Sequence, residues 1–307
     1  MKKINVLITW HKMVSFLKEN KKLKKKNIIY DFITAKQSLN EKKLSKIIHK
    51  YDGVICGDDE FNKKVIKKAK KLKVISKWGT GIDSIDKIYA NKKKIKVYNT
   101  PGAFTNSVAD IAIAFILNIA RKIYQTDKEI RKNNWPKFTG QSLNEKTLGI
   151  IGFGRIGKRL SEIALFFGMK IIFFDIKKIK TNKKCSQVSI KSLFKKSDFI
   201  TICCDLNPTS ENLVRLKYLK LMKKTSSLIN VSRGPIVNEA ELIYALNRGI
   251  INFACLDVFE KEPLNKKNKL LKMNNCILSS HNAFNSLEAV NKVNLNTLNN
   301  LYKGLNI

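Results

Sequence analysis

The chain has 307 residues, 44% of them hydrophobic and 27% charged, a balance typical of proteins that fold around a core rather than of disordered chains. The longest apolar run, 111–117, is far shorter than the roughly 20 residues that cross a bilayer. The N-terminus has too short an apolar stretch for a signal peptide. We therefore expect a cytoplasmic protein without a membrane partner.

The formal net charge of +36 raises the question of a nucleic-acid partner. Only seven of the 60 basic residues are arginine, and the lysines are spread through almost every polar segment instead of gathering beside aromatic side chains that could stack on bases. We interpret most of this charge as a solvated surface and expect no specific nucleic-acid binding. DNA or RNA binding is the minority alternative.

In the first hundred residues, short apolar runs alternate with amphipathic, lysine-rich segments. The predicted strands are 4–9, 27–33, 53–56, 72–76 and 95–99, with helix-like intervals such as 40–51 and 61–72. Alternation of this kind predicts a parallel sheet covered by helices.

The pattern changes after "NTPGAF" to a longer apolar helix, 108–123, and then to a polar connection. A second alternation follows, with predicted strands at 146–154, 169–175, 197–204, 226–232, 251–257 and 275–280. One helical segment, 286–303, remains, and we expect it to pack back on the first domain. The sequence therefore predicts an α/β protein of two doubly wound parallel-sheet domains, one formed by 1–99 with 286–307 and the other by 100–285.

A phosphate-binding turn is predicted at "TLGIIGFGRIGKRL", where Gly152, Gly154 and Gly157 have G-x-G-x-x-G spacing between a strand and a helix. The first glycine permits the tight turn, the second lets the backbone approach a pyrophosphate, and the third lets helix and strand pack closely. The helix N-terminus offers free N–H groups to the anion.

The next predicted strand ends in Asp175, 23 residues after Gly152, where a carboxylate can accept hydrogen bonds from an adenosine ribose. A carboxylate there also repels a 2′-phosphate, which favours NAD over NADP. The alternative is a glycine-rich turn followed by an incidental strand-end aspartate.

Polar side chains follow three further predicted strands of this domain. Arg233 follows the first, Asp257, Glu260 and Glu262 follow the second, and His281 follows the third. Because ligands of open α/β sheets lie beyond the carboxyl ends of strands, these side chains are expected to face one cleft.

Their chemistry suits a 2-oxo acid. Arg233 can bind a carboxylate through two parallel hydrogen bonds, and His281 can give or take the hydroxyl proton. A carboxylate beside a histidine stabilises the imidazolium. Taken alone, Arg233 could equally be a surface residue before Pro235. His11 also follows a strand and could contact substrate, whereas His49 fits a helix surface.

At these residues the sequence resembles the D-isomer specific 2-hydroxyacid dehydrogenase family, in particular its phosphoglycerate-dehydrogenase-like members. The resemblance extends over nearly the whole chain. Its motifs, in family order, are "KWGTGIDSID", "NTPGAFTNSVADIAIAFIL", "LNEKTLGIIGFGRIGKRL", "NVSRGPIVNEAEL", "LDVFEKEP" and "SSHNA".

The resemblance implies a Rossmann NAD-binding domain, a flavodoxin-like substrate domain and a homodimer joined through the NAD-binding domains. Arg233, Glu262 and His281 would be the catalytic residues, with Glu262 preferred to Glu260 because the family's acid stands directly before the proline, here Pro263. The implied cofactor contacts are Thr80, Gly152, Gly154, Arg155, Ile156, Gly157, Asp175, Cys204, Val231, Ser232 and Asp257. The expected substrate contacts are Lys77, Trp78, Gly79 and Arg233.

The predicted function is an NAD-dependent oxidoreductase that interconverts a D-2-hydroxy acid and its 2-oxo acid, with a phosphoglycerate-like substrate as one option. Gly57 stands where phosphoglycerate dehydrogenases commonly carry an arginine that helps to hold the substrate phosphate. The alternative function is a non-enzymatic, NADH-responsive binding protein of the same fold. The six cysteines have no C-x-x-C spacing, so we expect reduced thiols and no metal site.

Overall fold

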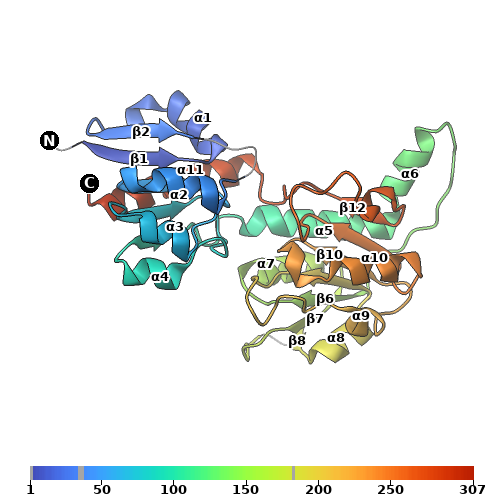
Figure 1. Ribbon diagram of the computed structural model, residues 1–307. Coiled ribbons are helices and arrows are strands. Elements are labelled where there is room, and N and C mark those ends of the chain that lie inside the picture. Colours follow the sequence, from blue (N-terminus) through green and yellow to red (C-terminus); the bar gives the residue numbers. More distant parts are fainter. Residues whose placement is uncertain (1–2, 34–37, 182–183) are drawn as a thin grey trace. The chain divides into compact units, whose positions relative to one another are not determined.

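The computed structural model describes residues 3–33, 38–181 and 184–307, and the chain divides into two compact units. The first unit consists of Met1–Phe104 and Ser286–Ile307, and the second of Thr105–Asn285 (Figure 1). The chain therefore leaves the first unit once and returns to it with its last helix.

The first unit holds, within its described residues, a five-stranded parallel sheet of order β2-β1-β3-β4-β5. This is the doubly wound order in which the strand sequence reverses between β1 and β3. Its strands are β1 (Ile4–Ile8), β2 (Ile28–Phe32), β3 (Gly53–Cys56), β4 (Val74–Lys77) and β5 (Lys96–Tyr98). Its helices are α1 (His11–Glu19), α2 (Glu41–Ile47), α3 (Lys63–Lys68), α4 (Lys87–Lys92) and α11 (Leu287–Leu305), with 3-10 turns η1 (Lys21–Leu23) and η2 (Ile48–Lys50).

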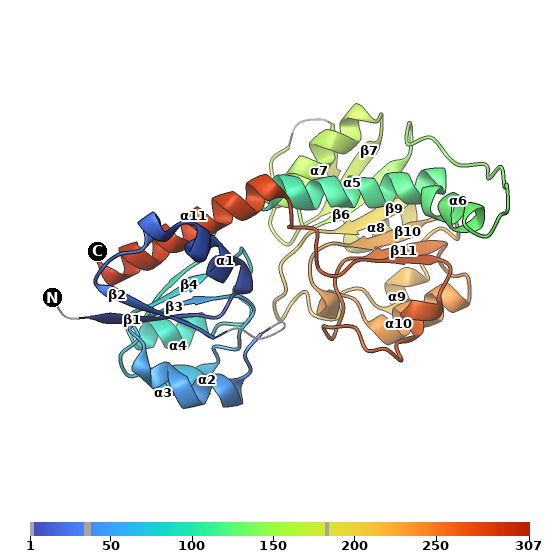
Figure 2. The same ribbon diagram turned by 90° about the horizontal axis from the view of Figure 1, so that it is seen from above.

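Helices cover both faces of this sheet: α1 and α11 lie on one face and α2, α3 and α4 on the other (Figure 2). The C-terminal helix is tied to β4, because the Ser76 hydroxyl donates to the Thr297 carbonyl over 2.7 Å. Gly304 allows the close approach, since a Cβ there would lie 2.2 Å from Val74. These contacts hold the last helix, α11, against the sheet of the first unit.

The second unit holds a seven-stranded parallel sheet, counted over its described residues, of order β12-β11-β10-β9-β6-β7-β8. The order reverses between β6 and β9, as in dinucleotide-binding Rossmann domains. Its strands are β6 (Thr147–Ile151), β7 (Lys170–Phe174), β8 (Cys185–Gln187), β9 (Phe199–Ile202), β10 (Ser227–Asn230), β11 (Phe253–Leu256) and β12 (Cys276–Leu278). Its helices are α5 (Thr105–Arg121), α6 (Ile123–Ile130), α7 (Arg155–Phe166), α8 (Ile190–Lys196), α9 (Leu216–Leu219) and α10 (Glu239–Asn247), with η3 (Gly234–Ile236) and η4 (Lys269–Lys272).

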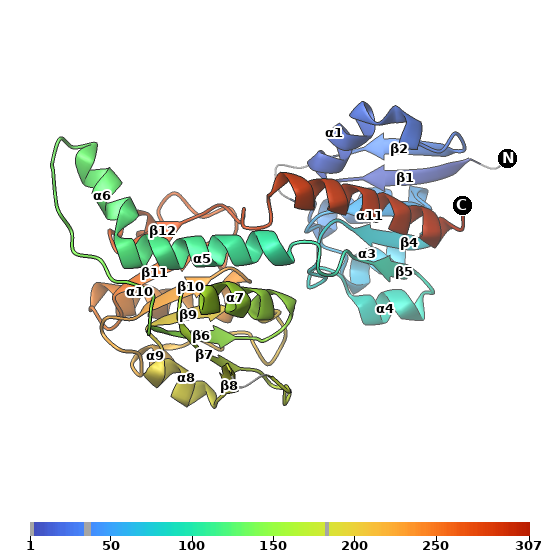
Figure 3. The same cartoon turned by 180° about the vertical axis from the view of Figure 1, so that it is seen from behind.

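The core of the second unit lies between its sheet and two helical layers. Strands β9, β10 and β11 are buried along their whole length, as expected of central parallel strands. Helices α5 and α7 pack together on one face, and α8, α9 and α10 lie on the other (Figure 3). The predicted fold class, two parallel-sheet α/β domains, is confirmed.

None of the helices formed by the described residues is long and apolar enough to span a membrane.

Candidate active site

The glycine turn between β6 and α7 has the geometry of a phosphate-binding loop. Gly152 has a φ of +90°, and a Cβ there would lie 2.5 Å from the backbone nitrogen of Cys204, so only glycine fits. A Cβ on Gly157 would lie 2.3 Å from the Gly152 carbonyl oxygen. A Cβ on Gly154 would meet no protein atom within 4 Å. The turn thus leaves open space at the first N–H groups of α7, where a pyrophosphate fits.

Asp175 joins this turn to the end of β7. One carboxylate oxygen accepts from the Phe153 backbone N–H over 2.9 Å, and the other accepts from the Lys177 N–H over 2.9 Å. The carboxylate is therefore fixed beside the glycine turn and retains lone pairs for a ribose hydroxyl. These residues fit an NAD molecule, with the pyrophosphate at α7 and the ribose at Asp175.

Other predicted cofactor residues surround the same strand ends. Arg155 and Ile156 are the first residues of α7, and the buried Val231 follows β10. The Ser232 hydroxyl donates to the carbonyl oxygen of Cys204, which joins the loops after β9 and β10. Burial raises the pKa of the Cys204 thiol to about 12, so this side chain is a neutral thiol at physiological pH.

Arg233 extends from the turn after β10 with an ordinary extended backbone. One of its guanidinium nitrogens donates to the Ser232 carbonyl oxygen over 2.9 Å. The following Gly234 packs so closely on the loop after β11 that a Cβ there would lie 1.9 Å from the Phe259 carbonyl carbon. The turn that carries Arg233 therefore rests directly on the loop that leads to Glu262.

His281 and Glu262 form a hydrogen-bonded pair. The His281 Nδ1 lies 2.7 Å from the Glu262 Oε2, and the two side chains are 27% and 20% exposed. The second carboxylate oxygen of Glu262 accepts from the Phe259 N–H over 3.0 Å. Because the carboxylate bonds to Nδ1, a proton that His281 exchanges with a ligand would pass through Nε2. Glu260 has a different role, because it accepts from the Glu239 N–H over 2.8 Å.

The loop that carries His281 is shaped by Asp257, which is fully buried at the end of β11. Its carboxylate accepts from the backbone N–H groups of Asn282 and Ala283 over 2.8 and 3.0 Å. Its carbonyl oxygen accepts from the His281 N–H over 2.7 Å. His281 has a φ of +53°, a conformation that costs energy in a residue other than glycine. These three hydrogen bonds hold it there.

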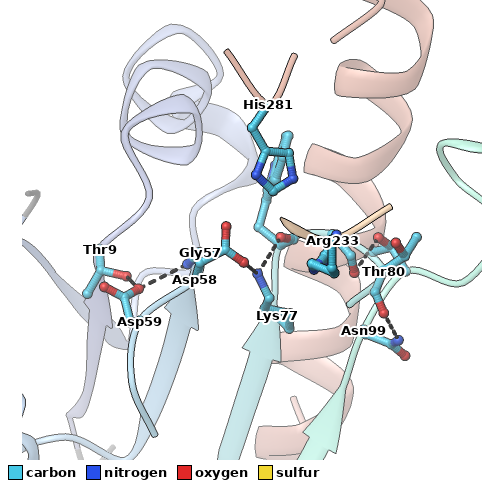
Figure 4. A network of polar contacts seen from close by, with 12 residues as sticks. Thr9, Gly57, Asp58, Asp59, Lys77, Thr80, Asn99, Arg233 and His281 are labelled. Carbon is cyan, nitrogen blue, oxygen red and sulfur yellow. Dashed lines mark hydrogen bonds and ion pairs between the residues drawn. The ribbon is translucent and has the colours of Figure 1, made fainter. Parts of the chain in front are cut away.

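In the first unit, the predicted substrate residues lie at the carboxyl end of β4. The Lys77 ammonium pairs with Asp58 over 2.7 Å, and Lys77 is only 4% exposed (Figure 4). Gly79 has a φ of +119°, and the Thr80 carbonyl oxygen accepts from the Asn99 side chain over 2.6 Å. The loop is therefore held in shape by an ion pair between the buried Lys77 and the exposed Asp58, and by Asn99, which follows β5.

Trp78 is almost fully buried, and its indole N–H donates to Asn294 of α11 over 2.7 Å. Its ring packs between Trp10 and Phe104, with centroids 5.2 and 5.6 Å away. The indole of Trp10 covers Gly57, since a Cβ on Gly57 would lie 2.4 Å from that ring. An aromatic cluster, of which only Trp10 is partly exposed, thus lies at the carboxyl ends of β1, β3 and β4.

Two buried or partly buried titratable groups stand at the same strand ends. Asp59 accepts from the Thr9 hydroxyl over 2.5 Å and from the Gly57 N–H over 3.0 Å (Figure 4), and burial raises its pKa. His11 begins α1 with its ring 4.6 Å from that of Trp10. Partial burial and then the Lys12 charge lower the His11 pKa, so its neutral form is favoured.

Across the described ranges, no group of three or more His, Cys, Asp or Glu side chains is arranged to hold a metal ion. Sequence reasoning missed one residue at the site, Asn230, whose side chain bonds to the turn that carries Arg233. Its position could have pointed to it, because Asn230 is the last residue of a buried strand and stands directly before that turn.

Comparisons with known proteins show the family of this chain. Residues 113–283 match the family model "D-isomer specific 2-hydroxyacid dehydrogenase, NAD binding domain". A hydroxypyruvate reductase of Thermotoga maritima is 35% identical over 276 residues, which cover 88% of this chain and 90% of that protein. A glyoxylate reductase of Thermococcus litoralis is 40% identical over 235 residues, covering 73% and 71%.

Among solved structures, a D-lactate dehydrogenase of Aquifex aeolicus in complex with NAD and lactic acid is similar to this chain. It superposes with a TM-score of 0.86 at 28% identity, and the match covers 96% of this chain and 93% of that one. On these matches and the strand-end geometry, the chain belongs to the D-isomer specific 2-hydroxyacid dehydrogenases, a family of NAD-dependent oxidoreductases.

Proposed function

We propose that this protein reduces a small 2-oxo acid to its D-2-hydroxy acid with NADH and catalyses the reverse oxidation with NAD. The observation that carries the proposal is the 2.7 Å pair of His281 and Glu262, set with Arg233 at the carboxyl ends of neighbouring parallel strands. We further propose that Thr105–Asn285 is the NAD-binding domain and that the first unit is the substrate domain.

In the proposed reaction each side chain has one task. The Arg233 guanidinium binds the substrate carboxylate and polarises the neighbouring 2-oxo group. His281, protonated at Nε2, donates that proton to the 2-oxo oxygen as it becomes a hydroxyl. Glu262 stabilises the imidazolium and holds the ring in the required orientation. Bound NADH supplies the hydride that C2 of the substrate receives.

The cofactor would be held by the residues of the second unit that line the glycine turn. Gly152, Gly154 and the first N–H groups of α7 would take the pyrophosphate, and Asp175 would take the adenosine ribose. The remaining proposed contacts of the second unit are Arg155, Ile156, Gly157, Cys204, Val231, Ser232 and Asp257. Thr80 of the first unit is also proposed as a cofactor contact.

Features of the first unit favour a small substrate without a phosphate group. Ligands of doubly wound sheets bind where the strand order reverses, which in this unit is between β1 and β3. There the Trp10 indole covers Gly57, and the nearby Lys77 ammonium is paired with Asp58. The partly exposed Trp10 indole at this position favours a short or apolar substituent over a phosphate. Lys77, Trp78 and Gly79 are the proposed substrate-domain contacts, and a phosphoglycerate-like substrate is the second candidate.

The experiment is NADH oxidation, followed by absorbance, with glyoxylate, hydroxypyruvate, pyruvate, 2-oxoglutarate and phosphohydroxypyruvate, and with NADPH as the control cofactor. We expect turnover with glyoxylate or hydroxypyruvate and a much higher kcat/KM with NADH than with NADPH. A preference for phosphohydroxypyruvate would favour the second candidate. Tight NADH binding without turnover of any 2-oxo acid would favour the non-enzymatic, NADH-responsive binding protein.

We also propose a homodimer joined through the NAD-binding domains. Large apolar side chains of the second unit are exposed on α6 and on the segment that follows it: Ile123, Ile130, Trp135 and Phe138, with Trp135 81% exposed. Exposed apolar patches of this kind mark association surfaces. Light scattering should give a mass of about twice 35.1 kDa, and Trp135→Asp should shift it toward one chain.

Finally, we propose that the protein is cytoplasmic and that its net charge of +36 does not serve to bind a specific nucleic acid. The six cysteines are all free thiols, which suits a reducing compartment. Retention on a DNA column that disappears at physiological salt would support a non-specific charge effect, whereas sequence-dependent retention would contradict it.

A further inference from the structure

The amide of Asn230 connects the last residue of β10 to the turn that carries Arg233. Asn230 is 1% exposed. Its Oδ1 accepts from the Ser232 backbone N–H over 3.1 Å, and its Nδ2 donates to the Arg233 carbonyl oxygen over 3.0 Å. The Asn230 side chain therefore bonds to both the Ser232 N–H and the Arg233 carbonyl oxygen.

The main chain of Asn230 reaches the other half of the site. Its carbonyl oxygen accepts from the Asp257 N–H over 3.0 Å, and Asp257 in turn holds the backbone of His281. The side chain and the main chain of Asn230 thus act on different loops. A change confined to the amide should disturb the Arg233 turn and leave the His281 loop in place.

We infer that Asn230 is the positioning residue for Arg233: its buried amide sets the backbone of the Ser232–Arg233 turn and thereby the direction of the guanidinium. This inference rests on the proposed function. The Ser232 N–H needs a hydrogen-bond acceptor and the Arg233 carbonyl oxygen needs a donor, and both lie close enough for a short side chain. An asparagine amide supplies the acceptor and the donor. Aspartate has the same shape but only acceptors, so it would set a carboxylate oxygen against the Arg233 carbonyl oxygen at about 3 Å.

The test compares Asn230→Asp with Asn275→Asp. Asn275 is a matched control, because its Nδ2 also donates to a backbone carbonyl oxygen, that of Leu246, over 3.1 Å. Both variants lose the same kind of hydrogen bond in the same unit, but only the first loses it at the Arg233 turn. KM, kcat, the NADH Kd and the pH profile of kcat/KM are measured for both variants and for the wild type.

For Asn230→Asp we expect KM for the 2-oxo acid to rise at least about tenfold, because Arg233 binds the substrate carboxylate in the ground state. The kcat should fall as well, by a smaller factor, because Arg233 also polarises the 2-oxo group in the transition state. The NADH Kd should change far less than KM, because aspartate keeps the acceptor for the Ser232 N–H and the glycine turn is unchanged. The pH profile should keep its wild-type midpoint, because the His281–Glu262 pair is not altered. Asn275→Asp should leave all four quantities unchanged.

Three results would overturn the inference: an unchanged KM, a loss confined to kcat, or a shifted pH profile, which would indicate general distortion of the site. If Asn230→Asp does not fold, Asn230→Ala removes both hydrogen bonds without adding a charge and should raise KM in the same direction. Absence of turnover in the wild type itself would contradict the proposed function instead.

Discussion

Replacing Gly154 with alanine should weaken cofactor binding without preventing the protein from folding. The backbone at Gly154 has a φ of −76°, which alanine adopts without strain, and a Cβ there would meet no protein atom within 4 Å. The glycine caps α7, so the cost in stability should be no more than about 1 kcal/mol, or roughly 2–4 °C in Tm for a chain of this size. The protein should therefore fold normally.

The same methyl group would occupy the space that the pyrophosphate is proposed to take. Displacing the anion weakens one or two hydrogen bonds to backbone N–H groups, each worth about 1.5–3 kcal/mol, so the NADH Kd should rise about 10- to 100-fold or more. Fluorescence titration measures the Kd, and a thermal scan measures the Tm.

Gly157→Ala provides the contrast, because its Cβ would lie 2.3 Å from the Gly152 carbonyl oxygen. That variant should lose about 1–3 kcal/mol of stability from overpacking alone. If Gly154→Ala binds NADH as tightly as the wild type, the pyrophosphate does not bind at this turn and the reasoning fails.

Three further predictions concern residues of the second unit. Glu262→Gln removes the negative charge that is hydrogen-bonded to His281 and that stabilises the imidazolium, so kcat for reduction should fall at least about tenfold; an unchanged kcat would contradict the pairing. Asp175→Ser removes the carboxylate that repels a 2′-phosphate, so kcat/KM with NADPH should rise relative to NADH in the same assay. Because burial raises the pKa of Cys204 to about 12, iodoacetamide at pH 8 should label it far more slowly in the folded than in the unfolded protein, as mass spectrometry would show.

The sheet strands were predictable where several apolar residues follow one another between polar segments, as in β7. The exception is β8, Cys185–Gln187, which sequence reasoning missed. It is a three-residue edge strand with two exposed residues, so burial leaves no apolar pattern in its sequence.

The candidate site was predictable to the level of strand ends. Parallel topology places the residues after β10, β11 and β12 at one edge of the sheet, and Arg233, Glu262 and His281 follow these three strands. Spacing could not distinguish Glu262 from Glu260, because loop conformation decides which carboxylate faces the ring; only the family resemblance favoured Glu262. Asn230 escaped notice because its role depends on two backbone contacts that no residue pattern encodes.

His281 is the proton donor of the proposed mechanism. Turnover of NADH with the preferred 2-oxo acid should be compared between the wild type and His281→Gln, with the NADH Kd measured for both. Loss of a positioned proton donor should lower kcat at least about 100-fold while the NADH Kd stays unchanged. Turnover by His281→Gln at the wild-type rate would contradict the proposed mechanism.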